Sequence, residues 1–105
     1  MRAALERFKR TIETAWPGRV LEMRLFGSMA RGDAHEGSDL DVFVMVDERD
    51  VDLDKSIRDA AYDVTYELDL PHPISPRIMS RDHFQDLLRL ERLLARAIVE
   101  EGIKL

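Results

Sequence analysis

Two short stretches of the sequence combine residue types that suit phosphate and metal chemistry. In the first, Gly27 and Ser28 directly follow an alternating segment that ends at Phe26. A glycine there permits a sharp turn and lets another group approach the backbone closely. A serine that opens a helical turn offers its hydroxyl and free N–H groups to a phosphate. Arg31, three residues further on, can approach phosphate oxygens or stabilise the turn.

The second stretch is an acidic pair at the start of a hydrophobic segment. Asp39 and Asp41 are two residues apart, so in an extended strand both carboxylates point to one face. Like charges on one face repel, and a divalent cation removes the conflict. Mg²⁺ is typically held by one or two carboxylates together with substrate phosphates, and such metals stabilise the attacking and leaving oxygens of nucleotidyl transfer. Each stretch alone has an ordinary alternative, a turn for the first and a solvated strand edge for the second.

Hydrophobic periodicity and turn residues indicate the elements that position these side chains. The sequence predicts helices over 2–15, 52–69 and 81–100, one helical turn over 28–31, strands over 20–26, 40–46 and 74–79, and a short final strand or frayed end at 103–105. This order predicts a single α/β (α+β) domain over residues 1–105, with a small mixed sheet of three to four strands covered by helices. Such domains place ligands at one end of the sheet, where the two stretches would converge.

Composition narrows the class of protein. The 105 residues are 45% hydrophobic and 35% charged, as in an ordinary globular domain. The sequence contains no cysteine, no bilayer-spanning apolar run and no signal-peptide pattern, so we expect a cytoplasmic protein without a membrane partner. The net charge of −5 argues against a long nucleic acid as partner, since phosphate backbones are bound by basic fields. A nucleotide that carries its own Mg²⁺ remains compatible.

GSMARG (27–32) followed by SDLDVFV (38–44) resembles the signature of the minimal nucleotidyltransferases, within the polymerase-beta-like nucleotidyltransferase superfamily. The family pattern is Gly-Ser, then Ala-Arg-Gly, then Ser-Asp-x-Asp on the next strand, and the resemblance covers nearly the whole chain. It implies that Gly27 and Ser28 cradle the phosphates of ATP. It also implies that Arg31 and Ser38 help to bind the nucleotide, and that the catalytic carboxylates Asp39 and Asp41 ligate Mg²⁺. An acceptor hydroxyl would attack the α-phosphorus, so that AMP is transferred and pyrophosphate released.

The sequence departs from this family at one catalytic position. The family commonly has a third carboxylate on the following strand, and Ser75 occupies the position that we align with it. A hydroxyl cannot replace an ionised carboxylate as a base at neutral pH. Asp69 and Glu67 lie upstream, and one of them could fold back into the site, although a solvated helix end is the preferred interpretation. Nucleotide binding therefore rests on residues that are present, whereas turnover depends on a group that Ser75 does not supply.

The last predicted helix carries two apolar stripes. The inward stripe comprises Phe84, Leu87, Leu88, Leu94 and Ile98, and the second comprises Leu90, Leu93 and Ala97 among arginines. The second stripe indicates either a broad core face or a surface for a partner or a second copy of the chain. The family resemblance implies a small helical HEPN-domain protein as partner, in toxin–antitoxin modules where this type of chain is the antitoxin.

Three hypotheses follow from the sequence. The first is an enzyme that transfers AMP from ATP to a hydroxyl, such as a tyrosine of a partner protein. The second is a nucleotide-binding antitoxin with impaired turnover that acts by binding its HEPN-domain partner. The third is a structural module whose acidic strand is incidental.

Overall fold

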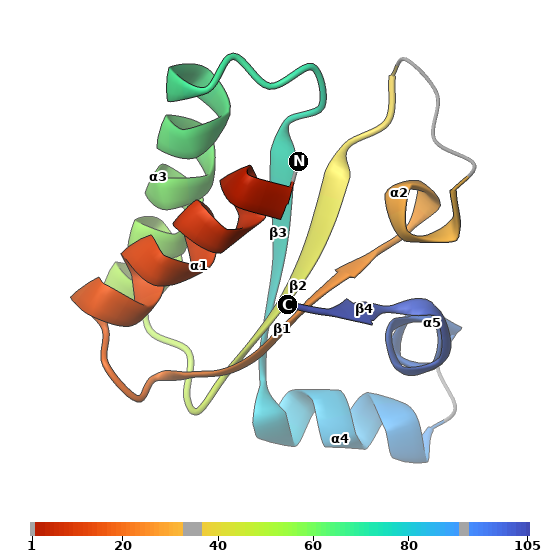
Figure 1. Ribbon diagram of the computed structural model, residues 1–105. Coiled ribbons are helices and arrows are strands. Elements are labelled where there is room, and N and C mark those ends of the chain that lie inside the picture. The colour runs from red at the N-terminus through yellow and green to blue at the C-terminus, as the bar shows by residue number, and fades with distance from the viewer. Residues whose placement is uncertain (1, 33–36, 91–92) are drawn as a thin grey trace.

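The computed structural model describes residues 2–32, 37–90 and 93–105, and Figure 1 shows their arrangement. The elements in chain order are α1 (Arg2–Ala15), β1 (Val20–Phe26), α2 (Ser28–Arg31), β2 (Leu40–Val46), α3 (Val51–Glu67), β3 (Ile74–Ser80), α4 (Arg81–Arg89), α5 (Leu93–Glu101) and β4 (Ile103–Lys104). Within the described residues the strands form one four-stranded sheet in the order β3-β2-β1-β4. The predicted α+β class and the mixed sheet are confirmed.

Strand direction brings the two sequence stretches to the same end of the sheet. β1 is antiparallel to β2 and to β4, whereas β2 and β3 are parallel. The last residue of β1, Phe26, pairs with Asp41 near the start of β2, and Asp41 pairs in turn with Ser75 near the start of β3. The glycine turn after β1, the acidic start of β2 and the start of β3 therefore lie side by side.

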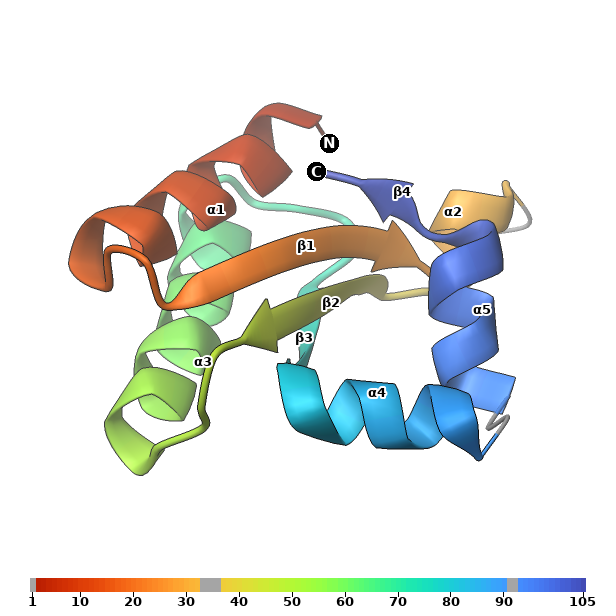
Figure 2. The same ribbon diagram turned by 90° about the horizontal axis from the view of Figure 1, so that it is seen from below.

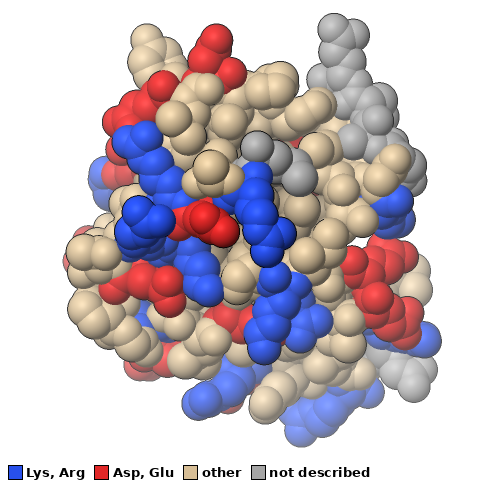
Figure 3. Space-filling model, in the orientation of Figure 1, with Lys and Arg blue, Asp and Glu red and all other residues tan. Residues whose placement is uncertain are grey.

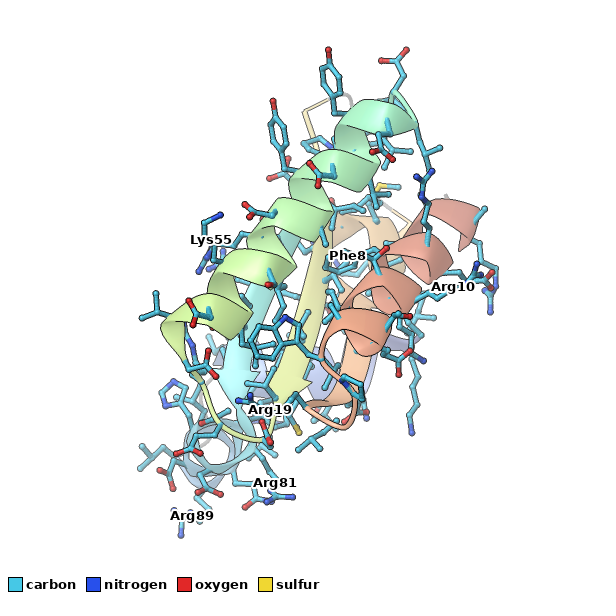
Figure 4. The ribbon with its side chains drawn as sticks, turned by 90° about the vertical axis from the view of Figure 1, so that its left-hand side faces the viewer. Phe8, Arg10, Arg19, Lys55, Arg81 and Arg89 are labelled. Atoms are coloured by element: carbon cyan, nitrogen blue, oxygen red, sulfur yellow. The ribbon has the colours of Figure 1, made fainter. Side chains whose placement is uncertain are left out.

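The sheet is covered on both faces by helices, and each face has its own core. Figures 1 and 2 show α1 and α3 together on one face and α4 and α5 on the other. The larger core joins α1 and α3 to alternate residues of β2, and its centre includes Phe8, which Figure 4 shows pointing between these two helices. The smaller core joins the opposite side of β2 to α4 and α5, with the rings of Phe43 and Phe84 4.8 Å apart between centroids.

The helix predicted over 52–69 is slightly displaced, for two local reasons. It begins at Val51 because the carboxylate of Asp50 caps it, accepting a hydrogen bond of 2.7 Å from the N–H of Leu53. It ends at Glu67, and Asp69 just beyond it adopts a left-handed backbone with φ 48°.

The single helix predicted over 81–100 is wrong, because the structure has two helices there. Ser80 is the N-cap of α4, and its hydroxyl accepts from the N–H of His83. Phe84 of α4 and Ile98 of α5 are buried in the same small core. In one straight helix these two residues would lie about 21 Å apart at 1.5 Å per residue, too far to fill one cluster. Packing against the sheet therefore requires a break that periodicity alone does not reveal.

The exposure of individual side chains decides between the interpretations of the two predicted stripes. Leu94 of the inward stripe is 36% exposed, and Leu90 and Leu93 of the second stripe are 65% and 82% exposed. The broad core face is therefore wrong for Leu90 and Leu93. The segment after α5, predicted as a strand or frayed end, forms β4. No helix in the described part of the chain is long and apolar enough to cross a bilayer.

Candidate functional site

Gly27 and Asp41 are in direct contact at the end of the sheet. Gly27 has φ 76° and ψ −157°, a region of backbone conformation that is essentially restricted to glycine. A Cβ added to Gly27 would lie 2.5 Å from Oδ2 of Asp41. The absence of a side chain at Gly27 therefore permits both the turn and the position of the Asp41 carboxylate beside it.

Asp41 lies in β2, and Asp39 is the residue directly before that strand. Leu40 between them is only 2% exposed and belongs to the core under α1 and α3, so Asp41 as the next residue of the strand faces away from that core. Partial burial raises the pKa of Asp41, and the nearby negative charge of Asp39 raises it further. The positive charges of Arg77 and Arg31 act in the opposite direction. The pair is thus close enough for mutual repulsion, with two arginines nearby.

A chain of hydrogen bonds joins the two halves of the motif. The hydroxyl of Ser28 donates to the hydroxyl of Ser38 over 3.1 Å, although the two serines are ten residues apart. Ser38 is 7% exposed, and its carbonyl accepts from Nδ1 of His72 at 2.8 Å. These contacts fix the turn after β1 against the segment that leads into Asp39.

Arg31 is the last residue of α2 and lies near Glu101, close to the C-terminal end of the chain. Its Nη1 is 3.4 Å from Oε2 of Glu101 in α5. It is also close enough to Asp41 to lower the pKa of that carboxyl group. Because α2 has only four residues, its dipole is small, and the turn would bind an anion mainly through N–H groups, the Ser28 hydroxyl and the Arg31 charge.

Ser75, which we align from the sequence with a third carboxylate, lies beside the site. The register places Ser75 next to Asp41 on the adjacent strand. Glu67 forms an ion pair with Arg7 of α1, so it belongs to the α1–α3 surface. Asp69 lies in the turn after α3 and is exposed.

The donor set fits Mg²⁺ bound together with a substrate. Among the described residues there is no group of three or more His, Cys, Asp or Glu side chains that could hold a metal on its own. Two neighbouring carboxylates match the way Mg²⁺ is bound when phosphates and water complete its coordination. Asp39 and Asp41 are therefore the candidate ligands.

Two residues near the site were missed in the sequence. His72, which lies between Pro71 and Pro73, binds the carbonyl of Ser38. Arg77 carries the positive charge that lowers the pKa of Asp41 most. The signal for Arg77 is its spacing of two from Ser75, which becomes meaningful only once β3 is paired with β2. The sequence offers no comparable signal for His72.

Fold and site together define a small mixed-sheet domain in which a glycine-serine turn faces a carboxylate pair. The family model described as nucleotidyltransferase domain matches residues 5–105. The chain therefore belongs to the nucleotidyltransferase domain family.

One curated protein shows sequence similarity to part of the chain. The chain is 39% identical over 51 residues to a Methanocaldococcus jannaschii protein with the name "Putative protein adenylyltransferase MJ0604". The match covers 49% of this chain and 48% of that protein, so the chain spans about half the length of this curated relative.

Solved structures share the fold at low sequence identity. One is a crystal structure of a toxin–antitoxin with AMP-PNP, which aligns with a TM-score of 0.60 at 18% identity over 94% of this chain and 70% of that one. A second, of a mutant of the toxin–antitoxin MntA–HpeT, aligns with a TM-score of 0.59 at 18% identity over 95% and 70%.

Proposed function

We propose that the chain is a Mg²⁺-dependent nucleotidyltransferase that transfers AMP from ATP to a hydroxyl group on a partner protein. The contact between Gly27 and the carboxylate of Asp41 carries this proposal. It places a turn with free backbone N–H groups directly beside an acidic group whose ionised form is disfavoured. A polyphosphate would accept hydrogen bonds from the N–H groups of the turn, and its divalent cation would stabilise the ionised carboxylate.

The residues of the chain would act mainly by binding and orienting the nucleotide. Gly27 and Ser28 would hold the β- and γ-phosphates, and Ser38 would fix the Ser28 hydroxyl through their hydrogen bond. Arg31 would offset the negative charge of the phosphates. Catalysis by such a site consists largely of positioning and charge stabilisation.

Asp39 and Asp41 would hold the metal ion. When bound there, Mg²⁺ neutralises negative charge on the phosphates and stabilises the oxygens at the reacting phosphorus. The raised pKa of Asp41 supports this role, because a cation beside the pair would favour both ionised carboxylates.

The names of the similar proteins support AMP as the group and a protein as the acceptor. One relative is named as a protein adenylyltransferase, and one structural neighbour is a toxin–antitoxin with AMP-PNP. We infer that the partner is a small helical HEPN-domain toxin and that the chain is its antitoxin. A nucleotide-binding antitoxin with impaired turnover is the second candidate, favoured by Ser75 in the position of the third carboxylate.

Transfer of label from α-labelled ATP distinguishes the two candidates. The chain is incubated with Mg²⁺, α-labelled ATP and the protein encoded by the neighbouring gene, and the Asp39→Ala variant is treated in the same way. The enzyme predicts label on the neighbouring protein that disappears with Asp39→Ala. A tight complex that never acquires label supports the impaired antitoxin instead.

A control variant shows whether loss of label transfer comes from removing a site residue or merely from removing one negative charge. Asp63→Asn removes one exposed carboxylate of α3 without touching the site, so it should transfer label as the wild type does. Equal loss of label with Asp63→Asn and Asp39→Ala would contradict the assignment of Asp39.

A further inference from the structure

The strand order indicates on which side of the carboxylates an acceptor must enter. The turn proposed to bind the β- and γ-phosphates follows β1, and the carboxylate pair lies on β2, which has β3 on its other side. In nucleotidyl transfer the attacking and leaving oxygens are roughly in line across the phosphorus. With pyrophosphate leaving toward β1, the acceptor hydroxyl arrives from the β3 side.

A groove lies on that side, along the free edge of β3. A cavity of about 350 Å³ is lined by Asp39, by Ser75 and by side chains of α3 that include Arg58 and Tyr62. A second cavity of about 390 Å³ is lined by Arg49, Arg77 and His83 among others. The two cavities share Arg58, Ser75 and Pro76, so we treat them as one groove along β3, to which the carboxylate pair contributes Asp39. We call it the β3-edge groove.

The charge of the β3-edge groove is positive. Asp39 is the single acid among the residues that line the two cavities, against three arginines. Arg49 is already neutralised by an ion pair with Asp54. Arg58 and Arg77 are exposed, and within the described residues neither guanidinium group forms an ion pair or a side-chain hydrogen bond, although the charge of Arg77 also acts on Asp41. In a chain of net charge −5, these two guanidinium groups form a local site for anionic groups.

The edge of β3 itself is poorly suited to adding another strand. The N–H of Ile74 is already occupied by the hydroxyl of Thr65 at 3.0 Å, and Pro76 has no N–H to donate. An occupant would therefore be held mainly through its side chains. Arginine forks recognise carboxylates with defined geometry, and the ring of Tyr62 offers an aromatic surface at the same cavity.

We propose that the β3-edge groove binds the acceptor as an acidic polypeptide segment, whose carboxylates contact Arg58 and Arg77 while its hydroxyl side chain enters beside Ser75. The charge of the groove fits such a segment, whereas the net charge of −5 opposes the several phosphate contacts that a nucleic acid requires. This proposal rests on the proposed function. In the transfer step the acceptor oxygen bonds to the α-phosphorus, the bond to pyrophosphate breaks, its electron pair leaves with pyrophosphate, and the hydroxyl proton passes to solvent.

The test uses two peptides that differ only in charge. One carries a single tyrosine flanked by glutamates, and the other has glutamines in their place. Binding of each fluorescein-labelled peptide to the full chain is followed by fluorescence polarisation, and label transfer from α-labelled ATP is measured in parallel. The variants are Arg58→Glu and, as a matched charge reversal, Arg10→Glu. Arg10 lies on the outer side of α1, away from α3 (Figure 4).

The proposal predicts that the acidic peptide binds more tightly than the glutamine peptide. It also predicts that Arg58→Glu weakens acidic-peptide binding by roughly tenfold or more, whereas Arg10→Glu and Mg²⁺–ATP binding to both variants stay unchanged. Equal binding of the two peptides, or equal losses in the two variants, would overturn it. So would a single-stranded RNA of the same length that displaces the acidic peptide at lower concentration, because the occupant would then be a nucleic acid.

Failure of the groove and failure of the proposed function give different results. If peptide binding depends on Arg58 but no label is transferred, the groove is supported as the peptide site and the proposed enzymatic transfer is contradicted. Label transfer that is indifferent to Arg58 retains the enzyme and contradicts the groove.

Discussion

Gly27 and Gly18 have nearly the same φ, 76° and 77°, but their surroundings differ. A Cβ at Gly18 would meet nothing within 4 Å, whereas one at Gly27 would meet the carboxylate of Asp41. A non-glycine residue would therefore be strained at either position, and the contact with the site is specific to Gly27. Comparing substitutions at the two glycines therefore distinguishes the effect of backbone strain from the effect of displacing the Asp41 carboxylate.

Gly27→Ala is expected to abolish Mg²⁺–ATP binding, because the new methyl group displaces the Asp41 carboxylate. Gly18→Ala should leave binding intact. Both variants should lose stability, on the order of 1–3 kcal/mol for a non-glycine residue held at positive φ. Urea unfolding and calorimetric titration of both variants check this, and nucleotide binding by Gly27→Ala at wild-type affinity would refute the contact's role.

Asp41→Asn is expected to increase the free energy of unfolding at neutral pH without metal. Burial and Asp39 raise the pKa of Asp41 in the folded state, so its ionised form is less favourable there than in the unfolded chain. A neutral amide removes this cost, by at most about 1 kcal/mol since water screens the group. Urea unfolding measures it against Asp63→Asn, and a loss of stability in Asp41→Asn would show that the carboxylate stabilises the fold.

At the scale of elements, the sequence predicts most helices and strands but not the packing that divides them. The strands at 20–26 and 40–46 are correct because their apolar residues alternate or run continuously. The break between α4 and α5 escapes prediction because Phe84 and Ile98 continue one helical pattern, and only the small core requires them to meet. Leu21 is 42% exposed because the β1–β2 register shifts between Val20 and Glu22, an irregularity that alternation does not show.

The division into α4 and α5 predicts different costs for two similar truncations. Phe84→Ala should destabilise the chain by roughly 3–5 kcal/mol, because it removes a ring packed on Phe43 in a buried cluster. Leu93→Ala should change stability by less than about 0.5 kcal/mol, since the side chain is exposed. Thermal unfolding of both variants provides the comparison. A large loss in Leu93→Ala would place that side chain in a core and favour one continuous helix.

Arg19 links the turn before β1 to the loop between β2 and α3. Its Nε donates to Oδ1 of Asp47 at 2.7 Å, its Nη2 donates to Oδ2 of Asp50 at 3.0 Å, and its guanidinium lies 5.7 Å from the ring centre of Trp16. The hydrogen bond from Arg19 lowers the pKa of Asp47. The pKa of Asp50 is lowered first by the N–H of Leu53 and then by Arg19.

These depressed pKa values determine how Arg19→Gln should behave with pH. A carboxylate with a lowered folded-state pKa stabilises the fold above its unfolded pKa of about 4, and that contribution is lost as the pH falls through the folded value. Arg19→Gln should therefore lower Tm at pH 7, and the difference from the wild type should narrow below about pH 4. The part of the Tm difference that comes from losing the contact between Arg19 and the Trp16 ring should persist at low pH. A difference that is constant from pH 7 to pH 3 would exclude the ion pairs as its cause.

On the scale of the whole molecule, the site is more predictable than its surroundings. Gly27, Ser28, Asp39 and Asp41 stand in two local motifs, so their meeting requires only that β1 and β2 be neighbours. Arg58, Arg77 and His72 approach the site through the parallel register of β3 and the packing of α3, which depend on contacts distant in sequence. Figure 3 shows one face on which basic and acidic side chains are interspersed rather than separated.

Calorimetric titration of Mg²⁺–ATP into the wild type and Asp41→Ala examines the proposed nucleotide site by itself, since it requires neither partner nor acceptor. We expect saturable one-site binding by the wild type that is lost in Asp41→Ala, and no comparable binding of ATP when Mg²⁺ is replaced by EDTA. Absence of binding by the wild type, or equal binding by the wild type and Asp41→Ala, would contradict it.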